Sequence, residues 1–151
     1  MKVINRKLFR EYEILETLEA GIVLNGAETK SVFLKHINLD ASYVKLMSGQ
    51  AHLINADIQK YRFALQDEYD AKRSRKLLFH KKELLKLQVK TASKGLTIVP
   101  VSCYNKGPYI KLEVALVRGR RDLEKKKIQK KQDEIRNEKR EMKEYLKTRQ
   151  Y

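Results

Sequence analysis

The chain of 151 residues is long enough for one domain with a modest core and an appendage, and too short for two full domains. Hydrophobic residues make up 42% and charged residues 35%, and 34 Lys and Arg against 19 Asp and Glu leave a net charge of +15. Solubility requires far less charge, so this excess favours a polyanionic partner, with nucleic acid ahead of a membrane surface.

Several classes of protein are disfavoured by what the sequence lacks. No apolar run approaches the roughly 20 residues of a membrane-spanning helix, and the start MKVINRKLFREYE lacks the apolar stretch of a secretion signal, so we expect a cytoplasmic protein. The single cysteine, Cys103, excludes an internal disulfide and is expected to be a buried thiol. Glycine-rich phosphate loops, metal-ligand spacing of the histidines and nucleophile motifs are missing, which disfavours an enzyme, a cofactor and a metal.

The first half of the chain contains short apolar groups separated by turn residues. Residues 12–24 hold two such groups, and residues 43–46 and 51–58 flank Gly49 as two short strands of a hairpin. Between them, Asn25-Gly26 leaves two possibilities, a hairpin turn or the start of a short helix over residues 27–34.

A basic segment, residues 72–76, precedes Leu77-Leu78-Phe79. One interpretation is a solvated loop between a strand and a helix. The other is a loop that grips phosphates with Arg73, Arg75 and Lys76 while the neighbouring apolar side chains stack on splayed bases. The N-terminal triplet Asn5-Arg6-Lys7 has similar composition but is weaker evidence, because basic termini are common.

The second half reads as a helix followed by a hairpin. Leucines among lysines predict a helix over residues 80–91, which residues 93–95 end with a basic residue and a glycine. Strict alternation over residues 109–117 predicts a half-buried strand, and residues 96–104 form its partner across a loop of about four residues. Pro100 cannot donate to a ladder, so an edge or a bulge is expected there.

Many short strands with two or three short helices predict a mainly β fold, a small antiparallel barrel whose closure removes exposed edges. An OB-fold-like barrel is the natural member of that class for an RNA partner. We place this RNA-binding barrel at residues 1–118 and a basic tail at residues 119–151, with the boundary at Arg118-Gly119.

The tail has a different composition from the rest of the chain. It holds 13 Lys or Arg and 7 Asp or Glu, a net charge of +6, which leaves +9 to the preceding residues. Residues 122–148 contain good helix formers and no breaker, but only one apolar residue per heptad. Three interpretations stay open: a coiled coil, a free helix or disordered solvated tail, and a segment that orders as a helix on an anionic surface.

Specific short motifs occur in order along almost the whole foldable part of the chain. They are Asn5-Arg6-Lys7, Tyr12-Glu13-Ile14, Glu19-Ala20-Gly21-Ile22, Gly26 with Glu28, Lys30 and Ser31, Asn38 with Ser42-Tyr43, Asn55, Ile58, Tyr61, Arg73-Ser74-Arg75-Lys76-Leu77-Leu78-Phe79-His80-Lys81-Lys82-Glu83, Lys94-Gly95-Leu96-Thr97-Ile98-Val99-Pro100 and Arg118-Gly119-Arg120-Arg121. Through these motifs the chain resembles the SsrA-binding protein family, the small protein B of bacterial trans-translation, over about residues 5–127.

The resemblance implies an OB-fold-like adaptor rather than an enzyme. Members of this family bind the tRNA-like domain of transfer-messenger RNA (tmRNA) and deliver it to ribosomes stalled on broken messages. The implied partners are that RNA, the small-subunit decoding region and mRNA channel of the ribosome, and elongation factor Tu indirectly through the RNA, for a monomer without cofactor or membrane contact. A general RNA chaperone or ribosome-associated structural protein is the alternative that explains the charge without the motifs.

The resemblance also implies particular site residues and favours the helix at Asn25-Gly26. It associates Asn5, Glu19 and Leu78 with RNA binding. Together with the basic segments, the predicted RNA-binding set is Asn5, Arg6, Lys7, Glu19, Lys30, Arg73, Arg75, Lys76, Leu77 and Leu78. The predicted ribosome-contacting tail residues are Arg120, Arg121, Leu123, Glu124, Lys125, Lys126, Lys130 and Lys131. Leu123 departs from the aromatic or His residue usual at that point of the family, which removes a ring able to stack on a base.

Overall fold

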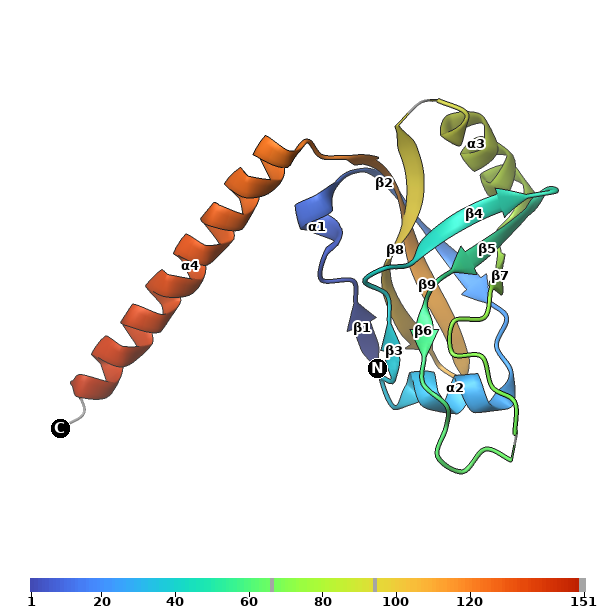
Figure 1. Ribbon diagram of the computed structural model, residues 1–151, viewed down its shortest axis with the longest axis horizontal. Helices are drawn as coiled ribbons and strands as arrows, with labels where there is room; N and C mark the ends of the chain where they lie inside the picture. Colours follow the sequence, from blue (N-terminus) through green and yellow to red (C-terminus); the bar gives the residue numbers. More distant parts are fainter. Residues whose placement is uncertain (66, 94, 150–151) are drawn as a thin grey trace. The chain divides into compact units, whose positions relative to one another are not determined.

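The computed structural model describes residues 1–65, 67–93 and 95–149, apart from the side chains of residues 122 and 123 (Figure 1). The chain divides into two compact units, Met1–Gly119 and Arg120–Tyr151. In its described residues the first unit contains nine strands and three helices, in chain order β1 (Lys2–Ile4), α1 (Leu8–Glu11), β2 (Tyr12–Ile22), α2 (Gly26–Phe33), β3 (Ile37–Asn38), β4 (Tyr43–Met47), β5 (Gln50–Ile54), β6 (Asp57–Ile58), β7 (Arg75–Leu78), α3 (Lys81–Thr91), β8 (Leu96–Lys106) and β9 (Tyr109–Gly119).

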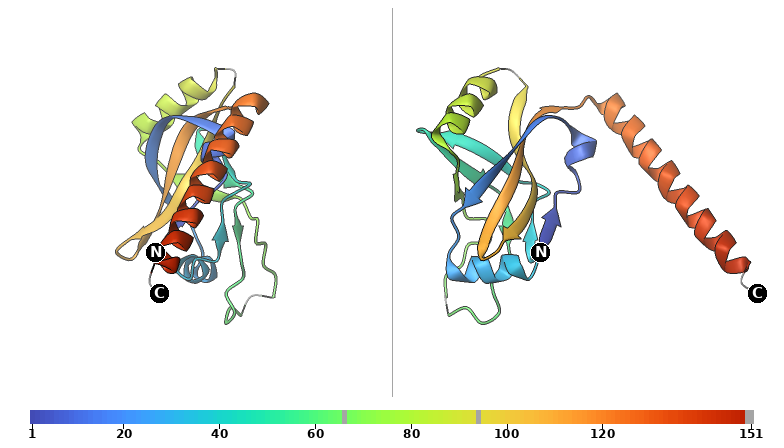
Figure 2. Two further views of the ribbon diagram at one scale, coloured as in Figure 1. Left: turned by 90° about the vertical axis from the view of Figure 1, so that its left-hand side faces the viewer. Right: turned by 180° about the vertical axis from the view of Figure 1, so that it is seen from behind.

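The strands close on themselves as an antiparallel barrel. The sheet order is β1-β8-β4-β5-β7-β2-β9, and β9 also pairs with β8, so the pairing from β8 through β9 returns to its start. β1 adds to β8 outside this circuit, and β3 pairs with β6 in a separate two-stranded sheet. α2 and α3 lie at opposite ends of the barrel (Figures 1 and 2). The predicted mainly β, OB-fold-like class is confirmed.

The β8–β9 hairpin is longer than predicted. Lys106 pairs with Tyr109, so the connection has two residues, Gly107-Pro108, rather than four. Gly107 has a φ of 58°, a left-handed conformation that glycine adopts without strain. The expected irregularity at Pro100 is present, because the register shifts between Pro100 and Ser102.

Asn25-Gly26 begins a helix rather than a turn. The Asn25 side chain accepts from Glu28 N at 2.8 Å, and Asn25 N donates to Glu28 Oε1 at 3.1 Å, which together form a capping box at the start of α2. Residues 51–58 are also two strands rather than one. Asn55 stands between β5 and β6 with a φ of 64° and donates to Ala41 O at 3.1 Å.

The core fills the barrel. Its centre includes the inward side chains Leu53, Leu77, Leu87, Leu112 and Val114, all nearly or fully buried. A smaller cluster forms where α1 covers the outside of β8 and β9 with Leu8. Cys103 lies in the core as predicted, and burial raises the pKa of its thiol to about 12.

The second unit consists of one helix, α4 (Asp122–Thr148), of 27 residues. Its apolar side chains Ile135, Met142, Tyr145 and Leu146 are exposed. Among the described residues of the chain, no helix is long and apolar enough to cross a membrane.

Candidate nucleic-acid interface

The outer surface of five neighbouring strands carries one continuous row of cross-strand partners. Leu78 of β7 pairs with Gly21 of β2, Gly21 with Lys111 of β9, Lys111 with Tyr104 of β8, and Tyr104 with Lys2 of β1. Directly opposed residues project to the same side of a sheet. We call this row, with the same-face residues Glu19, Lys106 and Tyr109, the outer face.

Glu19 is held on the outer face by two donors. The Tyr104 hydroxyl donates to Oε2, and Lys106 Nζ lies 2.8 Å from Oε2 and 3.0 Å from Oε1. The hydrogen bond from Lys106 and then that from Tyr104 lower the pKa of Glu19. Partial burial, followed by the hydrogen bond to Glu19, raises the pKa of Tyr104 to about 12. The site therefore presents a fixed, ionised carboxylate next to a neutral phenol and a cation.

Leu78 provides an apolar contact beside this carboxylate. Its side chain is 53% exposed and covers Gly21, where an added Cβ would lie 3.3 Å from Leu78 Cβ. A shallow groove of about 210 Å³ is lined by both residues together with Pro108, Tyr109 and Lys111. Tyr109 is 69% exposed, so its ring is free to stack on a base. Tyr109 directly precedes the buried Ile110 in a strand whose side chains alternate between the two faces. This alternation is the sequence signal that could have identified Tyr109 as a surface residue.

The structure places Arg75 in the interior, which corrects its prediction as a phosphate contact. The side chain is fully buried, with Nε 2.5 Å from Glu28 Oε2, and it also donates to Ala56 O at 2.8 Å and Ala71 O at 3.0 Å. Arg73 reaches the other Glu28 oxygen at 2.5 Å. Burial, the largest influence, raises the pKa of Glu28, but the hydrogen bonds from Arg73, from the Asn25 backbone and from Arg75 together hold it below its ordinary value.

Asn5 and Leu77 are also interior residues, so neither touches RNA from its position in this structure. Leu77 lies in the barrel core at 3% exposure. Asn5 donates from Nδ2 to Pro100 O at 2.9 Å and from its backbone to Val101 O at 2.8 Å. These bonds attach the segment after β1 to the irregular part of β8, directly before the basic residues Arg6 and Lys7.

The remaining predicted contacts lie on the surface, in different places. Lys76 is exposed on β7 and has His52 as its cross-strand partner. Lys30 is exposed on α2, with Nζ 5.9 Å from the centre of the Tyr61 ring. Arg6 and Lys7 are exposed after β1. The basic segment at residues 72–76 is thus divided by β7 into an interior arginine and outward cations, and it is not a single loop.

The predicted tail residues gather at the start of the second unit. Arg121 is the N-cap of α4, and Arg120 precedes it. The exposed residues Glu124, Lys126, Lys130 and Lys131 and the half-buried Lys125 follow in the first three turns. The Leu123 side chain lies outside the described residues.

Over the described ranges, no group of three or more His, Cys, Asp or Glu side chains is arranged to hold a metal ion. The outer face offers cations, the carboxylate of Glu19, and exposed aromatic and aliphatic side chains. Cations bind phosphates, carboxylates accept from the amino groups of bases, and exposed rings and leucines contact base faces. This combination suits a folded RNA.

Comparisons with known proteins identify the family to which this chain is similar. A model of the "SmpB protein" family matches residues 2–144. An SsrA-binding protein of Carboxydothermus hydrogenoformans is 42% identical, over 87% of this chain and 89% of the relative. That of Mycoplasma mycoides is 39% identical, over 93% and 94%. A solved structure described as "tmRNA-SmpB: a journey to the center of the bacterial ribosome" has 39% identity and a TM-score of 0.67, over 80% of this chain and 85% of that one. The chain belongs to the SmpB protein family.

Proposed function

We propose that this chain binds the tRNA-like domain of tmRNA through its outer face and delivers that RNA to stalled ribosomes for trans-translation. The observation that carries the proposal is that Glu19 and Leu78 lie on the same exposed face of the sheet. The family resemblance associates both with RNA binding, and they come from strands far apart in the sequence. The family match and the solved tmRNA-SmpB relative support the same RNA and the ribosome as partners.

Different residues of the outer face contact different parts of the RNA. Lys106, Lys111 and Lys2 bind phosphates and fix the position of the RNA. Glu19 would repel phosphates, so its fixed carboxylate is suited to accept hydrogen bonds from base amino groups. Leu78 and Tyr109 contact bases or riboses that leave the helical stack.

In this proposal the second unit binds the ribosome. α4 exposes almost all of its described side chains, and a helix of 27 residues reaches about 40 Å. A long, cationic helix fits a channel lined by phosphates, so α4 would occupy the mRNA channel when no message fills it. The protein then acts as a cytoplasmic adaptor without chemistry of its own, and elongation factor Tu joins through the RNA.

A competition titration tests the RNA specificity. The protein is bound to the labelled tRNA-like domain of tmRNA and challenged with an unrelated transfer RNA at equal concentration. We expect the unrelated RNA to displace little of the label. Equal displacement would favour a general RNA chaperone, the function that the charge of +15 alone would support.

Two variants locate the binding on the outer face. Glu19→Gln and Leu78→Ala should each weaken binding of the tRNA-like domain about tenfold, because the first removes the carboxylate that accepts from base amino groups and the second truncates an apolar contact. Leu85→Ala is the matched control, since Leu85 on α3 has the same 53% exposure as Leu78 and lies away from the outer face. Wild-type affinity in both test variants would place the RNA elsewhere on the protein.

A further inference from the structure

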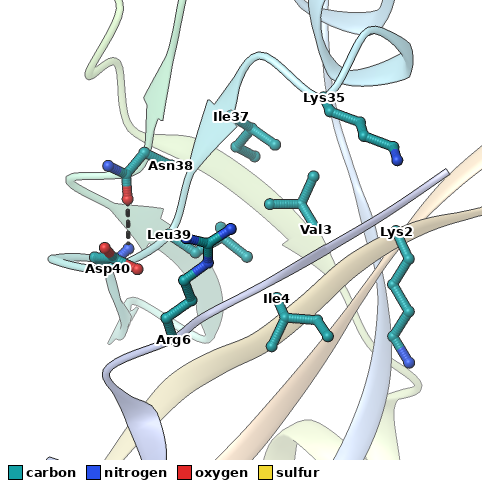
Figure 3. Close-up of a pocket in the computed structure, with 9 residues that line it drawn as sticks. All are labelled: Lys2, Val3, Ile4, Arg6, Lys35, Ile37, Asn38, Leu39 and Asp40. Atoms are coloured by element: carbon teal, nitrogen blue, oxygen red, sulfur yellow. Dashed lines mark hydrogen bonds between the residues drawn. The ribbon is translucent and has the colours of Figure 1, made fainter. Parts of the chain in front are cut away.

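A second hollow lies beside β1, away from the groove at Leu78. Its volume is about 570 Å³, and β1, the segment after it, the end of α2 and the residues around β3 line it (Figure 3). Val3, Ile37 and Leu39 supply an apolar floor. The charged lining consists of three cations, Lys2, Arg6 and Lys35, and one acid, Asp40.

The three cations are unpaired within the part of the chain that the structure describes. No ion pair joins Lys2, Arg6 or Lys35 to a described acidic residue, and all three are exposed. Figure 3 shows Lys35 and Lys2 to one side of Val3, and Arg6 and Asp40 to the other. The positive charges thus surround the apolar floor instead of converging on a single point.

Lys35 occupies a backbone position that glycine usually takes. Its φ is 64°, its N–H donates to Val32 O at 2.9 Å, and the next residue, His36, donates to Ser31 O at 2.9 Å. These two bonds close α2 as a Schellman motif, in which the left-handed residue is most often Gly. A lysine in this left-handed conformation is strained, whereas glycine would not be. A functional reason for lysine at this position would be a ligand of its ammonium group.

We propose that this hollow, which we call the β1 pocket, binds a stretch of RNA sugar–phosphate backbone apart from the outer face. Spaced cations suit successive phosphates, whereas a lone phosphate ion needs donors that converge. The apolar floor suits the riboses between those phosphates. Lys2 belongs to both surfaces, so one RNA can run from the outer face across β1 into the pocket. The inference rests on the proposed function, in that the RNA is tmRNA.

The substitution Lys35→Gly separates binding from folding. It removes the charge and relieves the left-handed strain, so we expect the melting temperature to stay the same or rise. Affinity for the tRNA-like domain should fall severalfold at moderate salt. The slope of log affinity against log salt should become shallower by about 0.7–0.9, the loss of one phosphate contact. Lys35→Arg keeps the charge and should retain the wild-type slope.

The matched control is Lys60→Ser, which removes an exposed lysine outside both surfaces and should leave the slope unchanged. A wild-type slope in Lys35→Gly, or an equal change in Lys60→Ser, would overturn the β1 pocket and leave the proposed function intact. Failure of the wild-type protein to bind the tRNA-like domain would overturn both. An acidic peptide that blocks the pocket without competing with RNA would also contradict it.

Discussion

Glu28 is an ionised carboxylate in the interior of the protein, and two arginines keep it so. Its side chain is 1% exposed, and Arg75 beside it is fully buried. Such a network is costly to break, because removal of one partner leaves a buried charge without compensation. It joins α2 to β7 and to the residues before β7, so it holds one end of the barrel together.

Glu28→Gln should therefore destabilise the protein by about 3 kcal/mol, measured by urea unfolding at neutral pH. Because the folded state holds the pKa of Glu28 below its ordinary value of 4.5, the stability from ionised Glu28 is present above pH 4.5 and is lost as the pH falls below it. The acid limb of the pH–stability curve should be shallower in Glu28→Gln. Glu11→Gln, which removes a carboxylate from a surface pair with Arg10 at 3.6 Å, should change stability by less than about 0.5 kcal/mol. An unchanged acid limb in Glu28→Gln would contradict this account.

Tyr104→Phe tests how Glu19 is positioned. Loss of the hydroxyl removes one of its two donors, so the pKa of Glu19, followed by NMR titration, should rise toward its ordinary value. Affinity for the tRNA-like domain should fall by roughly fivefold or less, with the fold unchanged. Tyr43→Phe changes an exposed tyrosine on β4 and should have neither effect. A lowered affinity without a change in the pKa would show that Tyr104 contacts RNA directly and does not position Glu19.

The sequence predicts Glu19 and Leu78 as RNA-binding residues of the outer face, but it does not separate surface from interior arginines. Arg73 and Arg75 stand two residues apart in one basic run, and both pair with Glu28, but the register of β7 buries only Arg75. No local pattern contains that pairing. The net charge also does not identify Glu19, because a search for basic residues does not select a carboxylate on an RNA-binding face. The resemblance to a family supplied it.

α3 is attached to the barrel by the buried Leu87, by the partly buried Leu84 and by ion pairs. Leu87 is 1% exposed in the core, and Glu16 of β2 pairs with Lys90 and, at 2.6 Å, with Lys86. Leu87→Ala should cost 2–5 kcal/mol in urea unfolding, since it leaves a cavity. Val89→Ala on the same helix, where the side chain is 75% exposed, should cost less than about 0.5 kcal/mol. Equal losses would mean that α3 packs by another face.

Ile135→Pro tests whether α4 acts as a helix. Proline in the helix interior removes a backbone hydrogen bond and disfavours the helix by about 3 kcal/mol. We expect binding of the tRNA-like domain to be unchanged and rescue of stalled ribosomes in a reconstituted translation assay to be lost. Ile135→Ala keeps the helix and should retain rescue. Full activity of Ile135→Pro would show that the tail works in another conformation.

The local sequence pattern predicts whether a segment is a helix or a strand better than it predicts where that segment begins and ends. The alternation in β9 and the leucine spacing in α3 predict both elements within two residues of their ends. The two-residue turn at Gly107 and the break at Asn55 depend on left-handed backbone conformations and on pairing with distant strands, so the sequence alone predicts a longer loop and a longer strand. α1 has only four residues and no pattern of its own.

At the scale of the whole molecule, the net charge is shared between the two units, and the proposed function gives each unit a different partner. The first unit combines a packed barrel with a mixed surface suited to a folded RNA. The second unit is a helix with a net charge of +6 over residues 119–151 and little apolar area to bury. The proposed function assigns the recognition of RNA to the first unit and the recognition of a ribosome without a message to the second.

The most direct measurement compares the intact chain with a chain ending at Gly119, each titrated against the tRNA-like domain of tmRNA and against ribosomes with an empty mRNA channel. We predict that the shortened chain binds the RNA within about threefold of the intact protein, apart from the loss of nonspecific charge attraction, and that it no longer binds the vacant ribosome. Parallel loss of both affinities would contradict the division between a barrel that holds the RNA and a helix that senses the channel.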